Sequence, residues 1–397
     1  MTEKIYEKQS YLKELSTEVT ACFYEGDSVY MQLKETIFFP EEGGQYSDTG
    51  YITAGEKTVH ILKGELIGSA TEGDTDIRYL VDGEIAAGTK VKCFLDWDKR
   101  FDRMQNHSGE HILSGLIHNL YGYNNIGFHL SDDEPVTLVC DGKLSPEQVK
   151  ELEIKANEAV YADLLISDSY PSKEELGSID YRSKIEIAGQ VRLITIGDPG
   201  DPLDICACCA PHVEETGAIG LIKVIQTSYV KGGTQLSILC GRRALEYINH
   251  HLDTLKTLAD SFSTHQDNVP ALVNNLRSEV SGLKEKLGNL TEKSILEDAG
   301  KENFNGLVIT EMELTPANMK NIFNSLLLMH EGYVGIFTGT DETGYMYYAG
   351  GKGLDARELG SRMKESLNAR GGGSAEMIQG KTSASKQEIT DFWKKEF

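Results

Sequence analysis

The sequence predicts an α+β protein of several domains, and three observations support this. Residues 1–95 contain short apolar or alternating stretches separated by turn clusters, which is typical of a small β-barrel. Residues 96–240 mix helical and strand-like patterns, which predicts a two-layer α/β core. Residues 241–300 repeat apolar positions at helical spacing, and residues 301–397 return to a mixed pattern. A helical hairpin and a small C-terminal α/β domain are therefore expected after the core.

Length and composition limit the class of protein. The chain has 397 residues, which is too long for one ordinary core, and its 40% hydrophobic and 25% charged residues indicate a globular protein. No long apolar run and no apolar leader within residues 1–13 are present, so no membrane contact is expected. Seven irregularly spaced cysteines favour reduced thiols and a cytoplasmic location. The net charge of −23 argues against a protein that coats nucleic acid non-specifically.

The first two domains are expected to contain these elements. Residues 29–33 and 91–95 are apolar or alternate, so they predict barrel strands. Residues 98–121 have a 3.6-residue pattern and predict a helix. A second helix is expected over residues 145–163, because Ser145 is a good N-cap and Pro146 suits the first helical position. Strands are expected at residues 191–196, 220–226 and 235–239.

The third and fourth domains have different patterns. Residues 245–258 and 272–290 each carry leucine, isoleucine or valine at three- and four-residue spacing, with a break at Pro270. Two helices that form an antiparallel hairpin or a dimerising coiled coil fit this pattern, and helices packed on their own domain are the alternative. In the last domain, strands are expected at residues 306–310, 333–338 and 344–349, and helices at 317–330 and at the C-terminus.

Two short segments carry candidate metal ligands. His107 and His111 lie four residues apart in a predicted helix and so share one face. Cys208 and His212 are again four apart, and the four residues together make a tetrahedral set suited to one zinc ion per chain. Plain packing of buried cysteines is the alternative. Residues 107–111 also match the H-x-x-E-H signature of inverted zinc peptidases, in which Glu110 would be the general base, but the downstream candidates are Cys and His rather than Glu.

Four motifs occur in an order that resembles a known family. Residues 38–50 (FFPEEGGQYSDTG) resemble the glycine-rich motif of alanyl-tRNA synthetase editing regions and of the free-standing AlaX proteins. Residues 100–113 and 208–220 look like the two zinc motifs of that family. Residues 370–380 (RGGGSAEMIQG) resemble its DHH-associated C-terminal domain, so the resemblance is to the long form of AlaX.

The second zinc motif departs from the family pattern, because Cys209, Ala210 and Pro211 replace its Gly-Gly-Thr. Cys206 and Cys209 add possible competing ligands.

The resemblance implies a zinc-dependent aminoacyl-tRNA hydrolase that acts in trans on mischarged tRNA(Ala). Seryl-tRNA(Ala), and also glycyl-tRNA(Ala), would be its substrates. No aminoacylation activity is expected, since no synthetic domain precedes the barrel. The alternative function is a non-catalytic, zinc-stabilised factor that binds tRNA or dimerises. A homodimer would form through residues 241–300 or through the C-terminal domain.

The resemblance also implies roles for single residues. The metal ligands would be His107, His111, Cys208 and His212. Candidate catalytic residues are Glu110, Gln45 and His129, although a solvated carboxylate and a structural histidine are the alternatives for the first and last. Candidate substrate or tRNA contacts are Gly43, Gly44, Thr49, Arg370, Gly371, Gly372 and Gly373. The C-terminal part is favoured for tRNA contact, because residues 351–397 contain nine basic and seven acidic residues.

Overall fold

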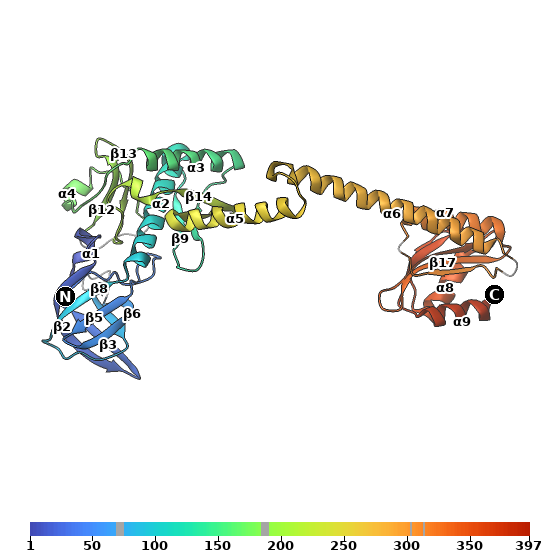
Figure 1. Cartoon of the computed structure of the whole chain (residues 1–397), viewed down its shortest axis with the longest axis horizontal. Helices are drawn as coiled ribbons and strands as arrows, with labels where there is room; N and C mark the ends of the chain where they lie inside the picture. The colour runs from blue at the N-terminus through green and yellow to red at the C-terminus, as the bar shows by residue number, and fades with distance from the viewer. Residues whose placement is uncertain (69–74, 184–189, 302–303, 313) are drawn as a thin grey trace. The chain divides into compact units, whose positions relative to one another are not determined.

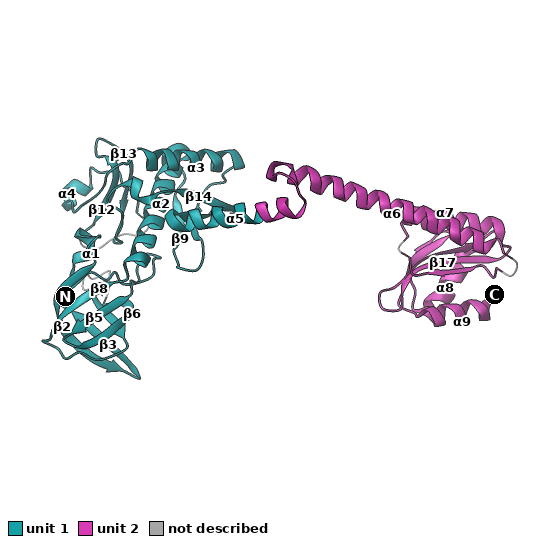
Figure 2. Ribbon diagram, in the orientation of Figure 1, with its two compact units in different colours: residues 1–254 teal, residues 255–397 magenta. Residues whose placement is uncertain are grey.

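The computed structural model describes residues 1–397 except 69–74, 184–189, 302–303 and 313. The chain divides into two compact units, which we call the N-terminal unit, residues 1–254, and the C-terminal unit, residues 255–397 (Figures 1 and 2). Within the described residues, no helix combines the length and the apolar character needed to cross a membrane.

The N-terminal unit begins with the predicted barrel. Six strands close in the order β2-β3-β7-β6-β5-β8, and alternate residues such as Val19, Met31, Ile52 and Tyr79 point inward and are fully buried. The barrel strands are β2 (Glu14–Glu25), β3 (Ser28–Leu33), β5 (Gly50–Ala54), β6 (Lys57–Ile67), β7 (Asp76–Val81) and β8 (Lys90–Leu95). Short segments β1 (Glu3–Lys4), α1 (Ile5–Lys8) and β4 (Glu35–Thr36) lie beside it.

The predicted mixed core follows the barrel. Helix α2 (Trp97–Tyr121) packs against helix α3 (Pro146–Tyr161) and against strands of two antiparallel sheets. Ser145 caps α3 through a capping box with Gln148, as expected from the sequence. One sheet has the order β14-β15-β10-β9, and the other β11-β12-β13. Their strands are β9 (Asn125–His129), β10 (Val136–Cys140), β11 (Ile166–Ser169), β12 (Leu193–Asp198), β13 (Asp201–Ala207), β14 (Ile222–Val230) and β15 (Gly233–Cys240). The short elements are α4 (Lys173–Leu176) and the 3-10 helix η1 (Thr216–Ile219).

Helix α2 is buried along most of its length, and small residues allow this. A Cβ at Gly109 would lie 2.3 Å from Sγ of Cys240 on β15, so only glycine permits this close approach. Asn106 on the same helix accepts a hydrogen bond from the Cys240 amide at 2.9 Å. Helix and sheet are therefore locked in one register, which fixes the direction in which the next turn of α2 points its side chains.

A buried ion pair joins the barrel to α2. Arg100 on α2 and Asp48 in the glycine-rich segment are both almost fully buried, and Nε of Arg100 donates to Oδ2 of Asp48 at 2.8 Å. The same carboxylate oxygen accepts from the Phe39 amide at 2.7 Å. One turn later, Arg103 donates to the carbonyl of Ser47 at 2.6 Å. The glycine-rich segment is thus attached to α2 at two neighbouring points.

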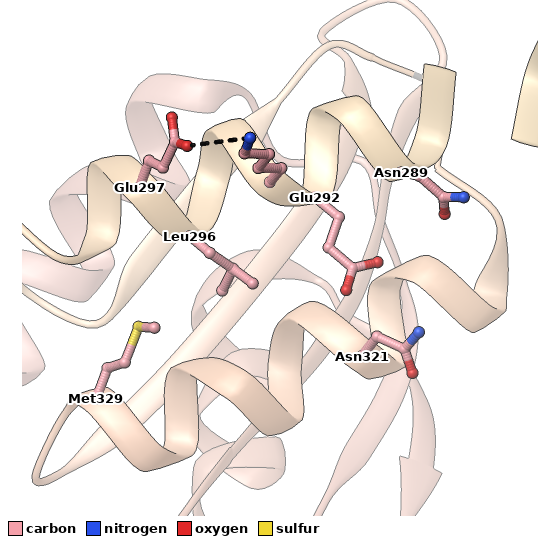
Figure 3. Close-up of a pocket in the computed structure, with 7 residues that line it drawn as sticks. Asn289, Glu292, Leu296, Glu297, Asn321 and Met329 are labelled. Carbon is pink, nitrogen blue, oxygen red and sulfur yellow. Dashed lines mark ion pairs between the residues drawn. The ribbon is translucent and has the colours of Figure 1, made fainter. Parts of the chain in front are cut away.

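The C-terminal unit is a three-layer α/β domain. Its sheet has the order β16-β17-β18-β20-β19, with α6 and α7 packed on one face and α8 and α9 on the other (Figure 1). Its elements are α6 (Val269–Ala299), β16 (Leu307–Thr310), α7 (Pro316–Met329), β17 (Tyr333–Thr340), β18 (Gly344–Gly351), α8 (Ala356–Leu367), β19 (Arg370–Gly373), β20 (Ile378–Thr382) and α9 (Lys386–Glu396). Between α6 and α7 lies an open hollow of about 560 Å³, beside the Lys293–Glu297 ion pair on α6 (Figure 3).

The glycine run, a candidate substrate or tRNA contact, lies in the edge strand β19, which pairs antiparallel with β20. Residues 241–300 do contain two long helices, α5 (Gly241–Ser261) and α6, separated by the short 3-10 helix η2 (Gln266–Asn268). Their pairing as a hairpin or coiled coil stays a prediction.

The Asp48–Arg100 pair should dominate the stability of the barrel–helix junction. We expect Asp48→Ala to lower the free energy of unfolding of the N-terminal unit by about 3–5 kcal/mol, because the arginine is left buried without its partner. Of the two tryptophans, only Trp97 lies in this unit, so its fluorescence during urea unfolding in a Trp393→Phe background reports the change. Glu14→Ala breaks the exposed pair with Lys92 and should cost no more than about 1 kcal/mol. Equal losses for the two variants would contradict the importance of the buried pair.

Candidate metal centre

The four predicted metal ligands lie together inside the N-terminal unit. One side-chain donor atom from each of His107, His111, Cys208 and His212 lies within 4.8 Å of the others. The two α2 histidines are one turn apart, and the other two residues come from the loop that follows β13. Sγ of Cys208 is 3.6 Å from Nε2 of His107 and 3.4 Å from Nε2 of His212. The arrangement can hold a metal ion.

Two of the imidazole rings are oriented by neutral hydrogen-bond partners. The carboxamide oxygen of Gln45 accepts from Nδ1 of His107 at 2.6 Å, and Nδ1 of His212 lies 3.0 Å from the hydroxyl of Ser108. The Ser108 hydroxyl also accepts from the Val213 amide at 3.3 Å. In both rings the hydrogen bond is made by Nδ1, so Nε2 faces the centre. Outer partners orient metal-binding histidines in the same way.

The third ring, His111, has a charged partner. Its Nδ1 is 3.4 Å from Oδ2 of Asp204, and Arg182 donates to both oxygens of that carboxylate at 2.7 Å. Cys206 also lies within 4.8 Å of His111 and Asp204, so these three form a second possible metal-binding group that shares His111. Because Arg182 already occupies both carboxylate oxygens, this group is better suited to supporting His111 than to binding a second ion.

Electrostatics favour a thiolate at Cys208 beside a neutral His212. Burial would raise the pKa of the Cys208 thiol, but the neighbouring His107 and His212 outweigh burial and lower that pKa well below its usual value. Burial lowers the pKa of His212 to about 3, so this ring is neutral near pH 7. Burial also opposes charge on His111, but Cys206, Asp204 and Cys208 raise its pKa well above the usual value. The Cys208 thiolate and the Asp204 carboxylate would attract a cation.

The other candidate cysteine, Cys209, faces a different way. It is not part of either metal-binding group found among the described residues. A Cβ built at Gly43 would lie 3.8 Å from its sulfur, which places Cys209 against the glycine-rich segment. Burial, together with the charge of Glu42, raises the pKa of this thiol well above its usual value. Cys209 therefore stays protonated and belongs to the packing between loop and barrel.

The glycine-rich segment places Gln45 beside His107. Gly44 has a φ of +86°, and a Cβ there would lie 2.7 Å from the carbonyl oxygen of Phe128. The Gly44 carbonyl accepts from the Leu130 amide at 2.9 Å, next to β9. This close contact lets the next side chain, Gln45, enter the buried site. Its Nε2 has no hydrogen-bond partner among the described residues, so it is a buried donor next to the cluster.

The remaining predicted site residues lie outside the cluster of four. Glu110 is buried, and one of its oxygens accepts from Ser114 at 2.5 Å and from Asn125. Thr49 donates to Asp96, the residue before α2, at 2.5 Å. His129 is exposed at the end of β9, with its ring edge-to-face against Tyr46. Arg370, Gly371, Gly372 and Gly373 are exposed on β19 in the C-terminal unit.

Sequence reasoning missed several supporting residues. Ser108 and Asp204 hold two of the rings, and Arg182 holds Asp204. Arg192 donates to the carbonyl of Ala210 at 2.8 Å and to that of Glu7 at 2.8 Å, and so fixes the loop between Cys208 and His212. The only available signal was a charged residue beside or within an apolar strand, as at Arg192 before β12 and Asp204 in β13.

Comparison with known proteins gives consistent matches. A family described as "Threonyl and Alanyl tRNA synthetase second additional domain" matches residues 191–236, which include Cys208 and His212. The alanyl-tRNA editing protein AlaX-L of Pyrococcus horikoshii is 28% identical, and the alignment covers 98% of this chain and 97% of that protein. An alanyl-tRNA editing protein of Xenopus laevis is 26% identical over 96% of this chain and 94% of its own length.

The predicted resemblance to the AlaX type is confirmed. An alanine–tRNA ligase of Methanoregula boonei is 25% identical over 96% of this chain, but this chain spans only 41% of that ligase. The similarity to AlaX proteins, in contrast, extends over nearly the whole of both chains. Both the metal cluster and the C-terminal unit therefore lie within the part of the chain that resembles AlaX.

Gln45 should tune metal binding through His107. We expect Gln45→Ala to weaken the affinity for zinc or cobalt by about 10- to 100-fold, because the ring loses the acceptor that orients it. Competition with a chelating dye measures this affinity. Thr49→Ala alters the same segment but only removes the bond to Asp96, so it should bind metal like the unmodified protein. If the two variants bind equally well, Gln45 does not orient the ring.

Proposed function

We propose that this chain is a zinc-dependent aminoacyl-tRNA deacylase that edits mischarged tRNA(Ala) in trans. The observation that supports the proposal most is the buried cluster of three imidazoles and one thiolate, in which each ring has an outer partner. Relatives that match over nearly the whole chain carry the name alanyl-tRNA editing protein. The reaction would be hydrolysis of the ester between a wrong amino acid and the terminal ribose.

The residues fit zinc better than other common ions. Imidazole nitrogen and thiolate sulfur are the ligands that zinc prefers, whereas magnesium and calcium need oxygen ligands. His107, His111, Cys208 and His212 would hold the ion. When bound, zinc supplies a Lewis acid that binds and orients the substrate or a water.

The other residues would position the substrate. The unpaired Nε2 of Gln45 can donate to an oxygen of the ester, because its carboxamide oxygen is already fixed on His107. A site that hydrogen-bonds the hydroxyl of serine would discriminate against alanine, which leaves the same polar groups unpaired. Proton transfer by Glu110 and contact by His129, Gly43, Gly44 or Thr49 stay predictions. Arg370 and its exposed glycines on β19 are proposed as a tRNA contact.

Two other functions would give different results. A non-catalytic, zinc-stabilised tRNA-binding factor would keep the metal cluster but would not hydrolyse the ester. A zinc peptidase of the inverted type would keep its metal when Cys208 is changed, because its ligands would not include that thiol.

Hydrolysis of seryl-tRNA(Ala) should depend on the cluster. The purified protein should release serine from seryl-tRNA(Ala) and spare alanyl-tRNA(Ala). A His107→Ala, Cys208→Ala double variant should lose at least about 100-fold in rate, since even outer partners of metal ligands often contribute that much. Metal content measured by mass spectrometry should fall in parallel, whereas Cys209→Ala should keep its metal. If seryl-tRNA(Ala) survives stoichiometric amounts of protein, the hydrolase proposal is wrong.

A homodimer through α6 is part of the proposal. Six apolar residues on this helix follow heptad spacing and are 38–67% exposed. They are Val273, Leu276, Val280, Leu283, Leu287 and Leu290. A separate face of α6, which includes Gly288 and Thr291, is buried against its own unit, so the exposed stripe remains available to a second copy.

The oligomeric state tests this stripe. Size-exclusion chromatography with light scattering should show a dimer, and Val280→Glu with Leu283→Glu should convert it to a monomer, because charges cannot be buried in a coiled-coil seam. Ser278→Glu places the same charge on the outer face of the helix and should leave the dimer intact. A dimer that survives the double change would favour the C-terminal domain as the interface.

A further inference from the structure

A second hollow lies in the N-terminal unit, outside the metal cluster. It has a volume of about 420 Å³ and opens between the start of α2, the segment after β9 and the start of α5. Its lining combines charged groups of both signs with an aromatic ring. The lining includes Lys99, Asp102, Asp132, Arg242, Arg243 and Tyr247.

The hollow contains a buried acceptor that lacks a donor. Asp102 is only 8% exposed, and its Oδ1 accepts no hydrogen bond from any described residue. Its other oxygen is 3.9 Å from Nη1 of Arg243, which is itself held by donation to the carbonyls of Ser131 and Glu134. Buried polar atoms in folded proteins are normally paired, so this oxygen fits a ligand that brings an N–H or O–H group.

The rim offers a stacking surface. The ring of Tyr247 packs 4.1 Å from the ring of His251, one turn further along α5. The side chain of Arg242 beside it is 62% exposed. Aromatic rings and guanidinium planes are the groups on which unpaired nucleobases stack.

The charge of the lining favours a base over a phosphate. Three basic residues, Lys99, Arg242 and Arg243, face four acidic ones, Asp102, Asp132, Asp133 and Glu246. This balance gives no net attraction for a phosphate group. It does suit the edge of a base, on which hydrogen-bond donors and acceptors alternate.

The hollow and the metal cluster draw on neighbouring stretches of the chain. Asp102 and His107 are five residues apart on α2, a rise of about 7.5 Å. Phe128, whose ring centre is 4.8 Å from that of His107, precedes Asp132 by four residues. Arg103 bonds both to Asp132 and to the carbonyl of Ser47 in the glycine-rich segment. Arg103 thus connects the lining of the hollow with the segment that carries Gln45.

We infer that this hollow binds the cytosine that precedes the terminal adenosine of the tRNA acceptor strand. The cytosine amino group would donate to Asp102, its ring nitrogen and carbonyl oxygen would accept from an arginine, and its face would stack on Tyr247. The unpaired 3′ end of every tRNA has the sequence CCA, so a cytosine lies one nucleotide before the esterified ribose. This inference rests on the proposed deacylase function.

Binding of short RNA tests the hollow separately from hydrolysis. Fluorescence anisotropy with the labelled trinucleotides CCA and CUA should show about tenfold tighter binding of CCA, because uracil presents a carbonyl where cytosine presents an amino group. Tyr247→Ala should weaken binding of both by about tenfold, and Tyr247→Phe should not. Asp102→Asn should remove the preference for CCA. Tyr161→Ala, which removes an exposed ring from α3, is the matched control.

A hydrolysis assay separates failure of this inference from failure of the proposed function. At low substrate concentration, the seryl ester of CCA should react about tenfold faster than the seryl ester of adenosine alone. Tyr247→Ala should abolish that difference, because it removes the stacking ring, and should leave the rate on seryl-adenosine unchanged. Equal affinity for CCA and CUA, or full binding by Tyr247→Ala, overturns the inference even if hydrolysis is intact. Tight, Tyr247-dependent binding of CCA without hydrolysis of any ester would retain the hollow and overturn only the deacylase proposal.

Discussion

The buried pair between Asp48 and Arg100 is the constraint on which the candidate site depends. The site draws on segments that are far apart in the sequence: the glycine-rich segment, α2, and the loop after β13. The pair fixes the first of these on the second, and Arg103 repeats the attachment one turn later. With that register set, Gln45 reaches His107 without any further adjustment. Burying two charges costs solvation free energy. Here the cost is offset because the two groups pair directly and the carboxylate also accepts a hydrogen bond from the Phe39 amide.

The third segment is fixed by a different arginine. Arg192 is nine-tenths buried and binds the carbonyls on both sides of Cys209, so the loop that carries Cys208 and His212 has little freedom. Asp204 on the preceding strand supports His111, with Arg182 behind it. The four ligands are thus positioned by groups that do not themselves touch the centre. A preorganised cluster of this kind loses little conformational entropy when an ion binds.

The sequence predicted the ligands better than it predicted their supports. His107 with His111, and Cys208 with His212, could be identified because residue type and four-residue spacing are local properties. The barrel and α2 were also predicted from local periodicity. Asp204 and Ser108 contact the candidate ligands, and Arg182 contacts Asp204, only through the tertiary register, which no local pattern encodes. Strand β19, which contains Gly371 to Gly373, was not predicted, since glycine weakens strands, but pairing with β20 outweighs that preference.

If the chain acts on tRNA as proposed, its net charge of −23 means that it cannot rely on a broadly basic surface. The structure suggests how recognition can be local instead. The hollow near α5 offers one unpaired acceptor, one stacking ring and arginines whose charges are balanced by neighbouring carboxylates. Contacts of that type read a base through its hydrogen-bonding edge and depend little on the phosphate backbone. Low general affinity for RNA would then be an advantage for an editing protein, because only an acceptor end placed correctly over the buried cluster would be held long enough to react.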